Sequence, residues 1–102
     1  MKAVTDNPGA SRYELRLDDE LVAFVRYRDT GELVDLVHTE TAAGYEGRGL
    51  AATLIAGVLD DLRGKGRKLR PSCPYVRRYL GKHPDQLDLV PDDIAAEISD
   101  GV

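Results

Sequence analysis

The sequence is poor in cysteine, in large aromatic residues and in long apolar runs. Its 102 residues include one cysteine, one phenylalanine and no tryptophan. A single cysteine excludes an internal disulfide, and it excludes a structural zinc site built on several thiolates, which takes about four Cys or His ligands. We therefore expect no metal site, and the low cysteine content is typical of a reducing compartment such as the cytoplasm.

No segment has the length and composition of a membrane span or an export signal. The longest apolar run, Leu50 to Leu59, contains a glycine and has about half of the ~20 residues needed to cross a bilayer. Residues 1–11 carry one lysine but lack the ~7 to 15 apolar residues of a signal peptide. The sequence predicts a soluble, cytoplasmic protein with no membrane partner.

Basic residues are fewer than acidic ones. There are 14 Lys and Arg against 18 Asp and Glu, which gives a formal net charge of −4. Binding to a phosphate backbone needs clustered cations that neutralise several phosphates, so we expect no nucleic-acid partner. A usual ~100 to 200 residues per domain indicates a single domain over residues 1–102, and this excludes an enzyme with a separate cofactor module.

Three strand patterns occupy the first part of the chain. Arg12 to Leu17 alternates polar and apolar residues, which predicts a strand with one buried and one wet face. Leu21 to Tyr27 is apolar on both faces apart from Arg26, as in a central strand. A turn at residues 29–32 leads to a third strand over Leu33 to Thr39, so the three strands form an antiparallel meander.

A glycine-rich loop at residues 42–49 then leads into an amphipathic helix, and Gly64-Lys65-Gly66 ends this helix. The apolar residues that share one helical face are Leu50, Leu54, Ile55, Val58, Leu59 and Leu62. Beyond it we predict a short strand over Arg67 to Cys73, a helix from Pro74 to His83, and a last strand over Leu87 to Val90. A final helix is predicted to start at Pro91-Asp92-Asp93.

The glycine-rich loop carries the clearest chemical signal. A glycine-rich turn that opens a helix presents unpaired backbone amides and the positive end of the helix dipole, which suit a phosphate or pyrophosphate. The third glycine of a dinucleotide-binding motif is absent, and antiparallel strands precede the loop. Gly49 is followed by Leu50, where a P-loop needs Lys and then Ser or Thr. The loop therefore predicts an anion site outside both common nucleotide classes.

Residues 46–51 read Glu-Gly-Arg-Gly-Leu-Ala, between the antiparallel strands and the amphipathic helix. In this motif and in the order of its elements, the chain resembles the GNAT acetyltransferase superfamily, whose motif reads Gln or Arg, two residues, Gly, one residue, and Gly or Ala. Three further segments are similar to a small, minimal GNAT-like family: His38 to Thr41, Pro71 to Val76 followed by Tyr79, and His83-Pro84. The resemblance covers about Arg12 to Val90 and leaves residues 91–102 as a C-terminal extension.

The resemblance implies an α/β (α+β) GNAT fold, with a mixed, mostly antiparallel sheet flanked by helices, and acetyl-coenzyme A as cofactor. It implies that main-chain groups at the end of the third strand hold the pantetheine arm, at Val37, His38 and Thr39. It also implies that the pyrophosphate lies on the loop and helix start at Gly47, Arg48, Gly49, Leu50, Ala51 and Ala52. Glu46 departs from the superfamily pattern, and a carboxylate repels a pyrophosphate unless it points away or pairs. We therefore exclude its side chain from the site and expect Arg48 to contact phosphate.

Cys73 is the first candidate for chemistry. Beside a thioester it could accept the acyl group or act as a polar neighbour of the leaving sulfur. The alternative is a small buried side chain, as most lone cytosolic cysteines are. Thiolate reactivity would need a nearby cation such as His38, or the helix N-terminus that Pro74 places directly after the cysteine.

The resemblance places Tyr79 at the position of the tyrosine that protonates the departing coenzyme A in many GNAT enzymes. A phenol with a pKa of ~10 is protonated at neutral pH and can act as a general acid. Tyr79 could equally be a core tyrosine, and Tyr75, one turn earlier, could take the acid role. Both are expected to contact the cofactor.

The two histidines are His38 and His83. We expect His38 to end the third strand on the face of Val34 and Leu36, either as the base that deprotonates the amine or as a structural residue. His83 is expected to end a helix and could touch the cofactor. The basic stretch of residues 63–70, together with Arg77-Arg78, offers contacts for the cofactor's 3'-phosphate.

Together these features predict an N-acetyltransferase that moves an acetyl group from acetyl-coenzyme A to an amine. The loop begins as early as residue 42, so the acceptor cleft should be open and suited to a protein lysine or N-terminus. The alternatives are a non-catalytic module or sensor that holds acetyl-coenzyme A or coenzyme A, and a structural interaction domain without a cofactor. We expect a monomer or a weak homodimer.

Overall fold

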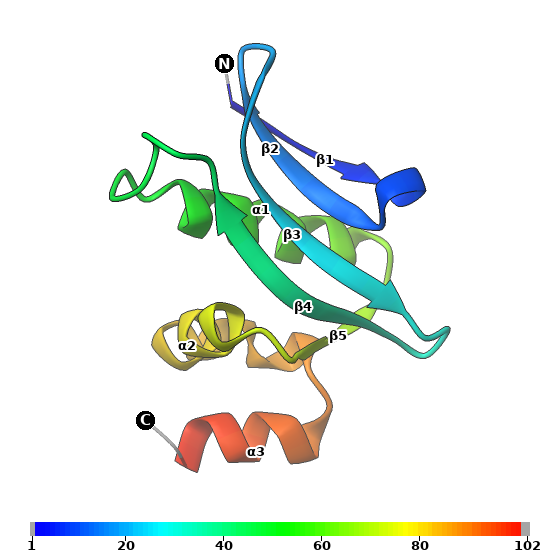
Figure 1. The fold of residues 1–102 in the computed structure, drawn as a ribbon. Helices are drawn as coiled ribbons and strands as arrows, with labels where there is room; N and C mark the ends of the chain where they lie inside the picture. Colours follow the sequence, from blue (N-terminus) through cyan, green and yellow to red (C-terminus); the bar gives the residue numbers. More distant parts are fainter. Residues whose placement is uncertain (1, 101–102) are drawn as a thin grey trace.

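The molecule is organised around a five-stranded sheet, in a computed structural model that describes residues 2–100. The strands lie in the order β1-β2-β3-β4-β5 (Figure 1). Neighbours from β1 to β4 are antiparallel, whereas β4 and β5 are parallel. The bounds are β1 (Lys2–Asn7), β2 (Arg12–Leu17), β3 (Glu20–Asp29), β4 (Leu33–Thr41) and β5 (Lys68–Pro71). The predicted mixed, mostly antiparallel sheet is confirmed, and β3 is its central strand.

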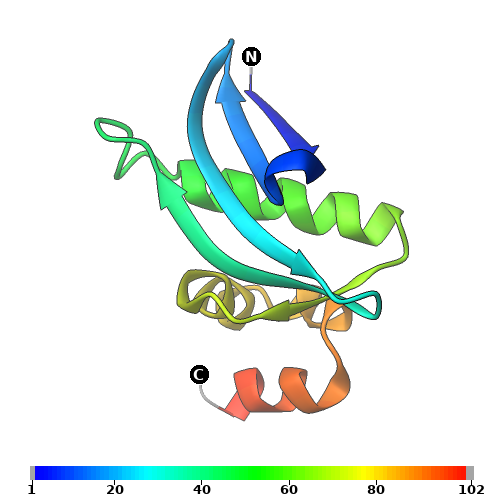
Figure 2. The ribbon, with the colours of Figure 1, turned by 45° about the vertical axis from the view of Figure 1, so that its right-hand side comes forward.

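The helices lie on one face of this sheet and beyond its β5 edge. They are α1 (Leu50–Gly64), α2 (Pro74–Lys82) and α3 (Asp92–Asp100), with short 3₁₀ helices η1 (Pro8–Ala10) and η2 (Pro84–Leu89). Helix α1 crosses behind the strands, and α2 and α3 lie beyond β5 (Figures 1 and 2). All six apolar residues that predicted the amphipathic helix are buried in α1, because their spacing keeps them on the face that meets the sheet.

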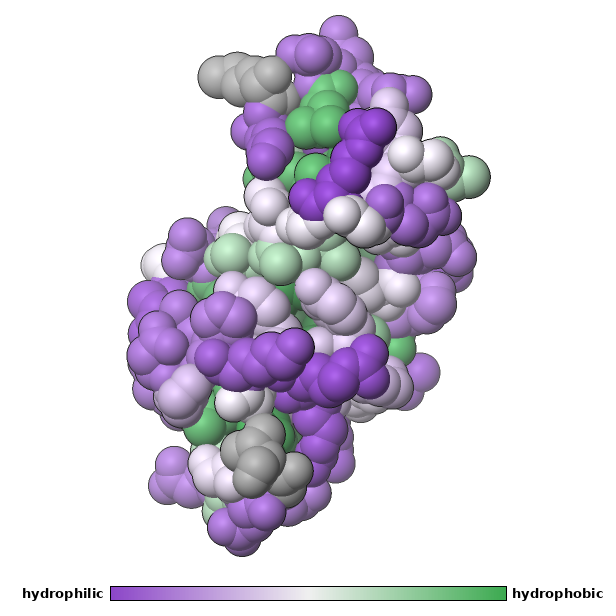
Figure 3. All heavy atoms as spheres, turned by 90° about the vertical axis from the view of Figure 1, so that its left-hand side faces the viewer, coloured by the Kyte–Doolittle hydropathy of each residue, from purple (hydrophilic) through white to green (hydrophobic). Residues whose placement is uncertain are grey.

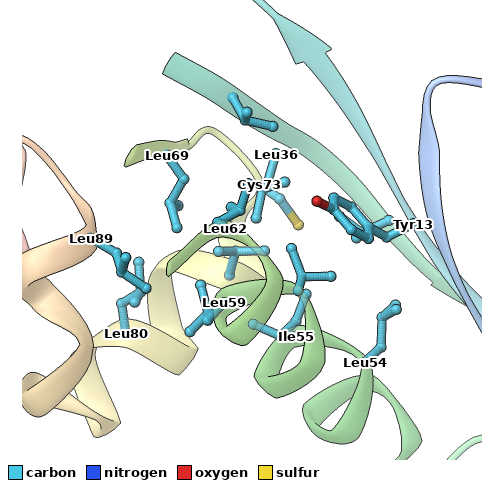
Figure 4. Packing of buried hydrophobic residues seen from close by; sticks show 14 of the residues in the cluster. Tyr13, Leu36, Leu54, Ile55, Leu59, Leu62, Leu69, Cys73, Leu80 and Leu89 are labelled. Atoms are coloured by element: carbon cyan, nitrogen blue, oxygen red, sulfur yellow. The ribbon is translucent and has the colours of Figure 1, made fainter. Parts of the chain in front are cut away.

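The core fills the space between α1, the sheet and α2. Leu59 and Leu62 of α1 meet Leu36 of β4, with Leu69 of β5 and Leu80 of α2 beside them (Figure 4). Each fully buried side chain of this kind contributes roughly 1.5–3 kcal/mol to folding. This packing fixes the start of α1 relative to the end of β4, where the predicted site lies.

Strand β1 is a correction to the sequence analysis, which predicted no strand in residues 1–11. Lys2–Asn7 pairs with β2 along its whole length, although most of its side chains are polar and exposed. Its one partly buried apolar side chain, Val4, lies opposite Leu15 and packs on the core. An edge strand with so little apolar alternation carries almost no periodic signal.

Gly57 of α1 lies against Val4 of β1, and Gly57→Ala is expected to lower the free energy of unfolding. An added Cβ would lie 2.6 Å from Cγ2 and 2.8 Å from Cβ of Val4, a stiff β-branched residue. Overpacking of this kind costs about 1–3 kcal/mol, against a gain of about 1 kcal/mol in helix propensity. Denaturant unfolding should therefore show a net loss.

Gly64→Ala in the same helix is the control, since nothing lies within 4 Å of its added Cβ, and it should be neutral or stabilising. The double variant Val4→Ala, Gly57→Ala should recover stability relative to Gly57→Ala alone. A Gly57→Ala protein as stable as the parent would show that β1 does not pack against α1 in this way.

A second departure lies between α2 and α3, where a last strand was predicted over Leu87 to Val90. The chain instead forms η2, with Pro84 and Asp85 in its first turn. Leu89 and Val90 are buried, so the apolar spacing there reflects contact with the core rather than membership of the sheet. Helix α3 follows as predicted from Asp92 and buries Ile94 and Ile98.

A polar network joins the C-terminal end of α1 to the sheet. The Tyr13 hydroxyl donates to Oδ2 of Asp61 at 2.5 Å, and the Tyr27 hydroxyl donates to Oδ1 of Asp6 at 2.6 Å. Lys65 Nζ lies 2.8 Å from the Asp61 carboxylate and 3.6 Å from that of Asp6. The network therefore holds α1, β1, β2 and β3 together at the end of the sheet away from the glycine-rich loop.

Acid is expected to destabilise the fold through the carboxylates in and beside this network. Hydrogen bonds from Arg67 and from the Gly31 amide lower the pKa of Asp29 from 3.8 to about 2. Hydrogen bonds from Lys65 and Tyr13 lower the pKa of Asp61. Because both folded pKa values lie below the unfolded ones, their contribution is complete above the unfolded value and is lost as the pH falls toward about 2.

Urea midpoints measured from neutral pH down to about pH 2 would show this fall, which Asp29→Asn should make shallower. A midpoint that stays constant across the acid range would contradict the network's contribution.

Candidate functional site

The two parallel strands of the sheet separate part-way along β4. Residues 33–36 pair with residues 68–71, and beyond Leu36 the strands part. The last link is a hydrogen bond of 2.8 Å from the Cys73 amide to the Leu36 carbonyl. From residue 37 to Thr41, β4 keeps β3 on one side, and no described strand lies on its other side. Its main chain therefore offers a free edge to which an extended ligand can pair.

A β-bulge at Val37 changes which side chains of β4 face α1. Tyr27 pairs with Leu36 but Arg26 pairs with His38, so Val37 is an extra residue. A bulge reverses the alternation of side chains beyond it. The next side chain after Leu36 that faces α1 is therefore that of Thr39, and His38 points to the opposite side of the sheet. The prediction that His38 ends the strand on the face of Leu36 is wrong.

On its own face of the sheet, the His38 side chain is 57% exposed, and its Nε2 lies 3.7 Å from the Glu40 carboxylate. The strand itself continues to Thr41. Any base role of His38 therefore concerns an amine that arrives on the side of the sheet opposite α1.

The glycine-rich loop is tied to the sheet at its start and along its length. The Ala42 amide donates to the Val22 carbonyl at 2.8 Å, and the Tyr45 amide donates to the Ala42 carbonyl at 3.0 Å. The Tyr45 hydroxyl donates to the Glu20 carboxylate, and the Arg48 guanidinium lies 5.0 Å from the centre of the Tyr45 ring. These contacts hold the first half of the loop, from Ala42 to Tyr45, against β3.

The residue that departs from the superfamily motif, Glu46, is engaged within the loop. Its Oε2 accepts a hydrogen bond of 2.9 Å from the Gly44 amide. This carboxylate therefore has a partner inside the loop, and that partner is a backbone amide rather than the guanidinium of Arg48. The side chain of Arg48 is exposed, and its guanidinium lies over the Tyr45 ring.

The start of α1 has the features of an anion site. Gly47 and Gly49 have φ values of +79° and +73°, a left-handed conformation that glycine adopts without strain. Gly49 caps the helix without a side chain, and its carbonyl accepts from the Thr53 amide at 3.1 Å. The amides of residues 50–52 precede the first helical hydrogen bond and have no helical acceptor. The first turn carries no acidic residue, so the positive end of the helix is open to a negative group.

Beside this helix start lies a cavity of about 180 Å³ between α1 and α2. Its walls bring together four predicted cofactor residues and two cations: Ala52, Tyr75, Tyr79, His83, Arg78 and Lys82. Seen from the side that carries the loop, a band of near-neutral surface, pale green to pale lilac, separates two hydrophilic regions (Figure 3). Lys82 was missed by sequence reasoning, although its spacing of four from Arg78 places both on one helical face.

Tyr79 and His83 are stacked, with ring centroids 4.0 Å apart and an interplanar angle of 16°. His83 Nδ1 also lies 2.8 Å from the Tyr79 carbonyl oxygen, and His83 caps α2 as predicted. Burial raises the pKa of both Tyr79 and Tyr75, so both phenols are protonated at neutral pH. Both therefore retain a proton that they can donate.

Cys73 lies where the two strands part, at the residue before α2. Its side chain is 4% exposed and stands among the core leucines (Figure 4). Its sulfur is 3.4 Å from the hydroxyl oxygen of Thr39, a contact that sequence reasoning missed because the bulge is what turns Thr39 inward. Pro74 begins α2 directly after it, as predicted, whereas His38, the expected neighbouring cation, faces the other side of β4.

Most of the predicted basic stretch is engaged elsewhere. Arg63 pairs with Asp88, Lys65 with Asp61 and Arg67 with Asp29. Of the Arg77-Arg78 pair, Arg77 contacts Glu97 at 3.1 Å. Arg78 is thus the predicted phosphate contact that lines the cavity beside α1.

Within residues 2–100, no group of three or more His, Cys, Asp or Glu side chains is arranged to hold a metal ion. None of the helices in the same range is long and apolar enough to cross a membrane.

The sheet splits beyond Leu36, and the glycine-rich loop opens a helix whose first turn carries no acidic residue, an arrangement suited to an extended, anionic ligand. The profile of the family described as GCN5-related N-acetyl-transferase matches residues 12–89. The chain belongs to this family. The matched residues are almost the same as the range, about residues 12–90, over which the sequence resembles the GNAT superfamily.

Individual relatives agree with this assignment. Protein NATD1 of Gallus gallus and protein NATD1 of Mus musculus are each 35% identical to the chain over 63 residues, 61% of this chain and 57% of theirs. The chain thus spans a little over half the length of these relatives. The solution structure of a GCN5-like protein from Staphylococcus aureus has a TM-score of 0.66 at 18% identity and covers 87% of each chain. At that identity the likeness shows the fold.

Proposed function

We propose that the protein binds acetyl-coenzyme A and transfers its acetyl group to an amine. One observation carries the proposal: the glycine-rich loop, the open start of α1, the free edge of β4 and the cavity beside α2 all meet in one region. Family membership is consistent with it, but the cofactor and the acceptor are inferences from the geometry. A GNAT core over residues 12–90, extended by residues 91–102, is part of the same proposal.

The residues present fit this cofactor in charge and in shape. The amides of residues 50–52 suit the pyrophosphate, and the two left-handed glycines let it approach the backbone closely. The free edge of β4 suits the amide groups of the pantetheine arm. Arg78 and Lys82 place two cations in the cavity wall for further phosphate.

The cofactor supplies an acetyl thioester, and the chain's own groups position it and move one proton. Main-chain amides near the bulge at Val37 would orient the acyl oxygen. Tyr79 or Tyr75 would donate a proton to the departing thiolate. Cys73, supported by the Thr39 hydroxyl, would lie near the reacting carbonyl, either as an acyl acceptor or as a polar neighbour.

Single-turnover incubation with acetyl-coenzyme A labelled in the acetyl group tests the proposal. We expect the label to move to an added lysine peptide, with or without passing through Cys73. If the protein binds the cofactor but passes no label to Cys73 or to any amine, transfer is contradicted. A non-catalytic cofactor module, the second candidate, would then be favoured, and the burial of Cys73 to 4% exposure is the observation on its side.

The two tyrosines can be told apart by replacing each with phenylalanine. The variant that removes the general acid should lower kcat by about tenfold, a modest loss because a thiol with a pKa of ~8.5 leaves readily. The other variant should leave kcat nearly unchanged. Since burial raises the pKa of both tyrosines, the parent's rate, plotted against pH, should not begin to fall below about pH 10. A limb that falls near neutral pH would exclude both phenols as the acid.

Three further expectations belong to the proposal. The single cysteine suits a cytoplasmic location. We also expect a monomer or a weak homodimer. An open acceptor side would suit a protein lysine or N-terminus as acceptor.

A further inference from the structure

The face of the sheet opposite α1 differs from the rest of the molecule in cover and in charge. No helix of residues 2–100 crosses it (Figures 1 and 2). Strand register brings five arginines to this face, Arg12, Arg16, Arg26, Arg28 and Arg70, against the three carboxylates Glu14, Asp35 and Glu40. We call these eight residues, with Phe24 and His38, the open face. Its arginines exceed its carboxylates by two, whereas the whole chain has a net charge of −4.

In the β2 half of the open face, two arginines share one carboxylate, which leaves one positive charge in excess. Arg12 and Arg16 lie 2.7 Å and 3.1 Å from the Glu14 carboxylate, which is only 4% exposed. This corrects the expectation of a simple wet face on β2. Next to them, Arg12 and Arg26 lie 4.7 Å and 5.5 Å from the centre of the Phe24 ring. This half therefore offers an aromatic ring that two guanidinium groups contact.

The β3 to β5 half has arginines without carboxylate partners. Arg26, Arg28 and Arg70 are exposed, and none forms an ion pair within the described residues. Asp35 lies between Arg28 and Arg70 in register, and its Oδ1 is buried without a hydrogen-bond partner. A buried acceptor without a partner is costly.

The open face leads into a hollow of about 330 Å³ between β5, the start of α2 and α3. Arg70 belongs to both, and the hollow is further lined by Ser72, Pro74, Arg77, Ile94 and Glu97. Ser72 and Pro74 are the neighbours of Cys73, so the hollow ends at the point where the two strands part. The cavity between α1 and α2, which is proposed to hold the cofactor, lies on another side of α2, along Tyr75 and Tyr79.

We propose that the open face and this hollow dock an acidic polypeptide segment that delivers the acceptor amine. Carboxylates of the segment would contact Arg26, Arg28 and Arg70, and the amine would enter beside Cys73. The inference rests on the proposed function and adds the class of acceptor. The amine nitrogen forms a bond to the acetyl carbon as the carbon–sulfur bond breaks; the amine's proton goes to solvent or His38, and the thiolate takes one from a tyrosine.

An acidic polypeptide suits this surface better than a nucleic acid does. The cations are interrupted by Asp35 and Glu40, which would repel a continuous phosphate backbone. Carboxylates spaced along a polypeptide can meet the arginines and avoid these two positions.

The test measures binding of two fluorescein-labelled peptides by anisotropy, without cofactor. Both carry one central lysine, flanked by glutamates in one peptide and by glutamines in the other. We expect the glutamate peptide to bind at least tenfold more tightly, and added salt to weaken it. Arg26→Glu and Arg70→Glu should each weaken it about three- to tenfold, because a surface attraction becomes a repulsion. Arg26→Gln, which introduces no negative charge, should act in the same direction.

Lys2→Glu is the matched control, since Lys2 is exposed on the edge strand and lies outside the open face. It should leave the affinity for the glutamate peptide unchanged. Equal binding of the two peptides, an equal loss in Lys2→Glu, or preferential binding of a single-stranded oligonucleotide would each overturn the proposal.

Acetylation rates with the same peptides keep this inference separate from the proposed function. A glutamate peptide that binds but is never acetylated supports the docking surface and contradicts the transferase. Acetylation that proceeds equally fast on both peptides supports the transferase and overturns the docking surface.

Discussion

Ala52→Glu is expected to weaken the binding of coenzyme A by more than tenfold. Ala52 lies in the first turn of α1 and also lines the cavity beside α2. A carboxylate there would add the negative charge that this first turn lacks, and it would fill part of the cavity. Repulsion of a pyrophosphate held on the neighbouring amides would then exceed about 1.4 kcal/mol, which corresponds to a tenfold change in affinity.

Isothermal titration of coenzyme A into the parent and the variant measures this effect. Ala96→Glu on α3 is the matched control, because Ala96 is exposed and lies outside both cavities. It makes the same chemical change in a helix on another part of the surface and should leave the affinity unchanged. If Ala52→Glu binds coenzyme A as well as the parent does, the pyrophosphate does not lie at the start of α1.

Cys73→Ala is expected to lower the rate of acetyl transfer about a hundredfold, the lower end of what a positioned polar group at the reacting carbonyl contributes. The thiol stands where β4 and β5 part, in contact with the Thr39 hydroxyl. The affinity for coenzyme A should change little, because the proposed phosphate and pantetheine contacts do not include the thiol. The cost in stability should be small, about 1 kcal/mol, since one buried heavy atom is removed.

Two companion variants sharpen this result. Cys73→Ser replaces the thiol by a hydroxyl. If Cys73 is the nucleophile, this variant should transfer acetyl as slowly as Cys73→Ala; if Cys73 is a polar neighbour, it should recover part of the rate. Thr39→Val removes the contact to the sulfur while it keeps the shape of the side chain. Undiminished turnover in Cys73→Ala would remove the cysteine from the mechanism and leave it as a core residue.

The sequence predicted the parts of the fold that have strong local patterns. The stripe from Leu50 to Leu62 defined α1 because six buried residues share one helical face. The loop at residues 42–49 marked the helix start because glycines are needed at its left-handed positions. The wider architecture, a mixed and mostly antiparallel sheet flanked by helices, followed from the resemblance to a known superfamily rather than from residue patterns.

The features that the sequence did not reveal depend on contacts between distant elements. Strand β1 has little apolar alternation, and it is recognisable mainly from the fit of Val4 against Gly57. Without β1, Glu14 was assigned to a wet face, although Asn7 and two arginines cover it. The bulge at Val37 has no sequence signature in this chain, yet it decides that Thr39 rather than His38 shares a side of β4 with Cys73.

The most direct test of the account is a titration of the isotope-labelled protein with coenzyme A, followed by two-dimensional amide NMR. The account predicts saturable shifts at the amides of Gly47 to Ala52, at residues 37–39 of β4 and at residues 75–83 along the cavity. The amides of β1 and of the C-terminal end of α1 should not move. The absence of shifts at millimolar coenzyme A, or shifts confined to surfaces away from the glycine-rich loop, would contradict it.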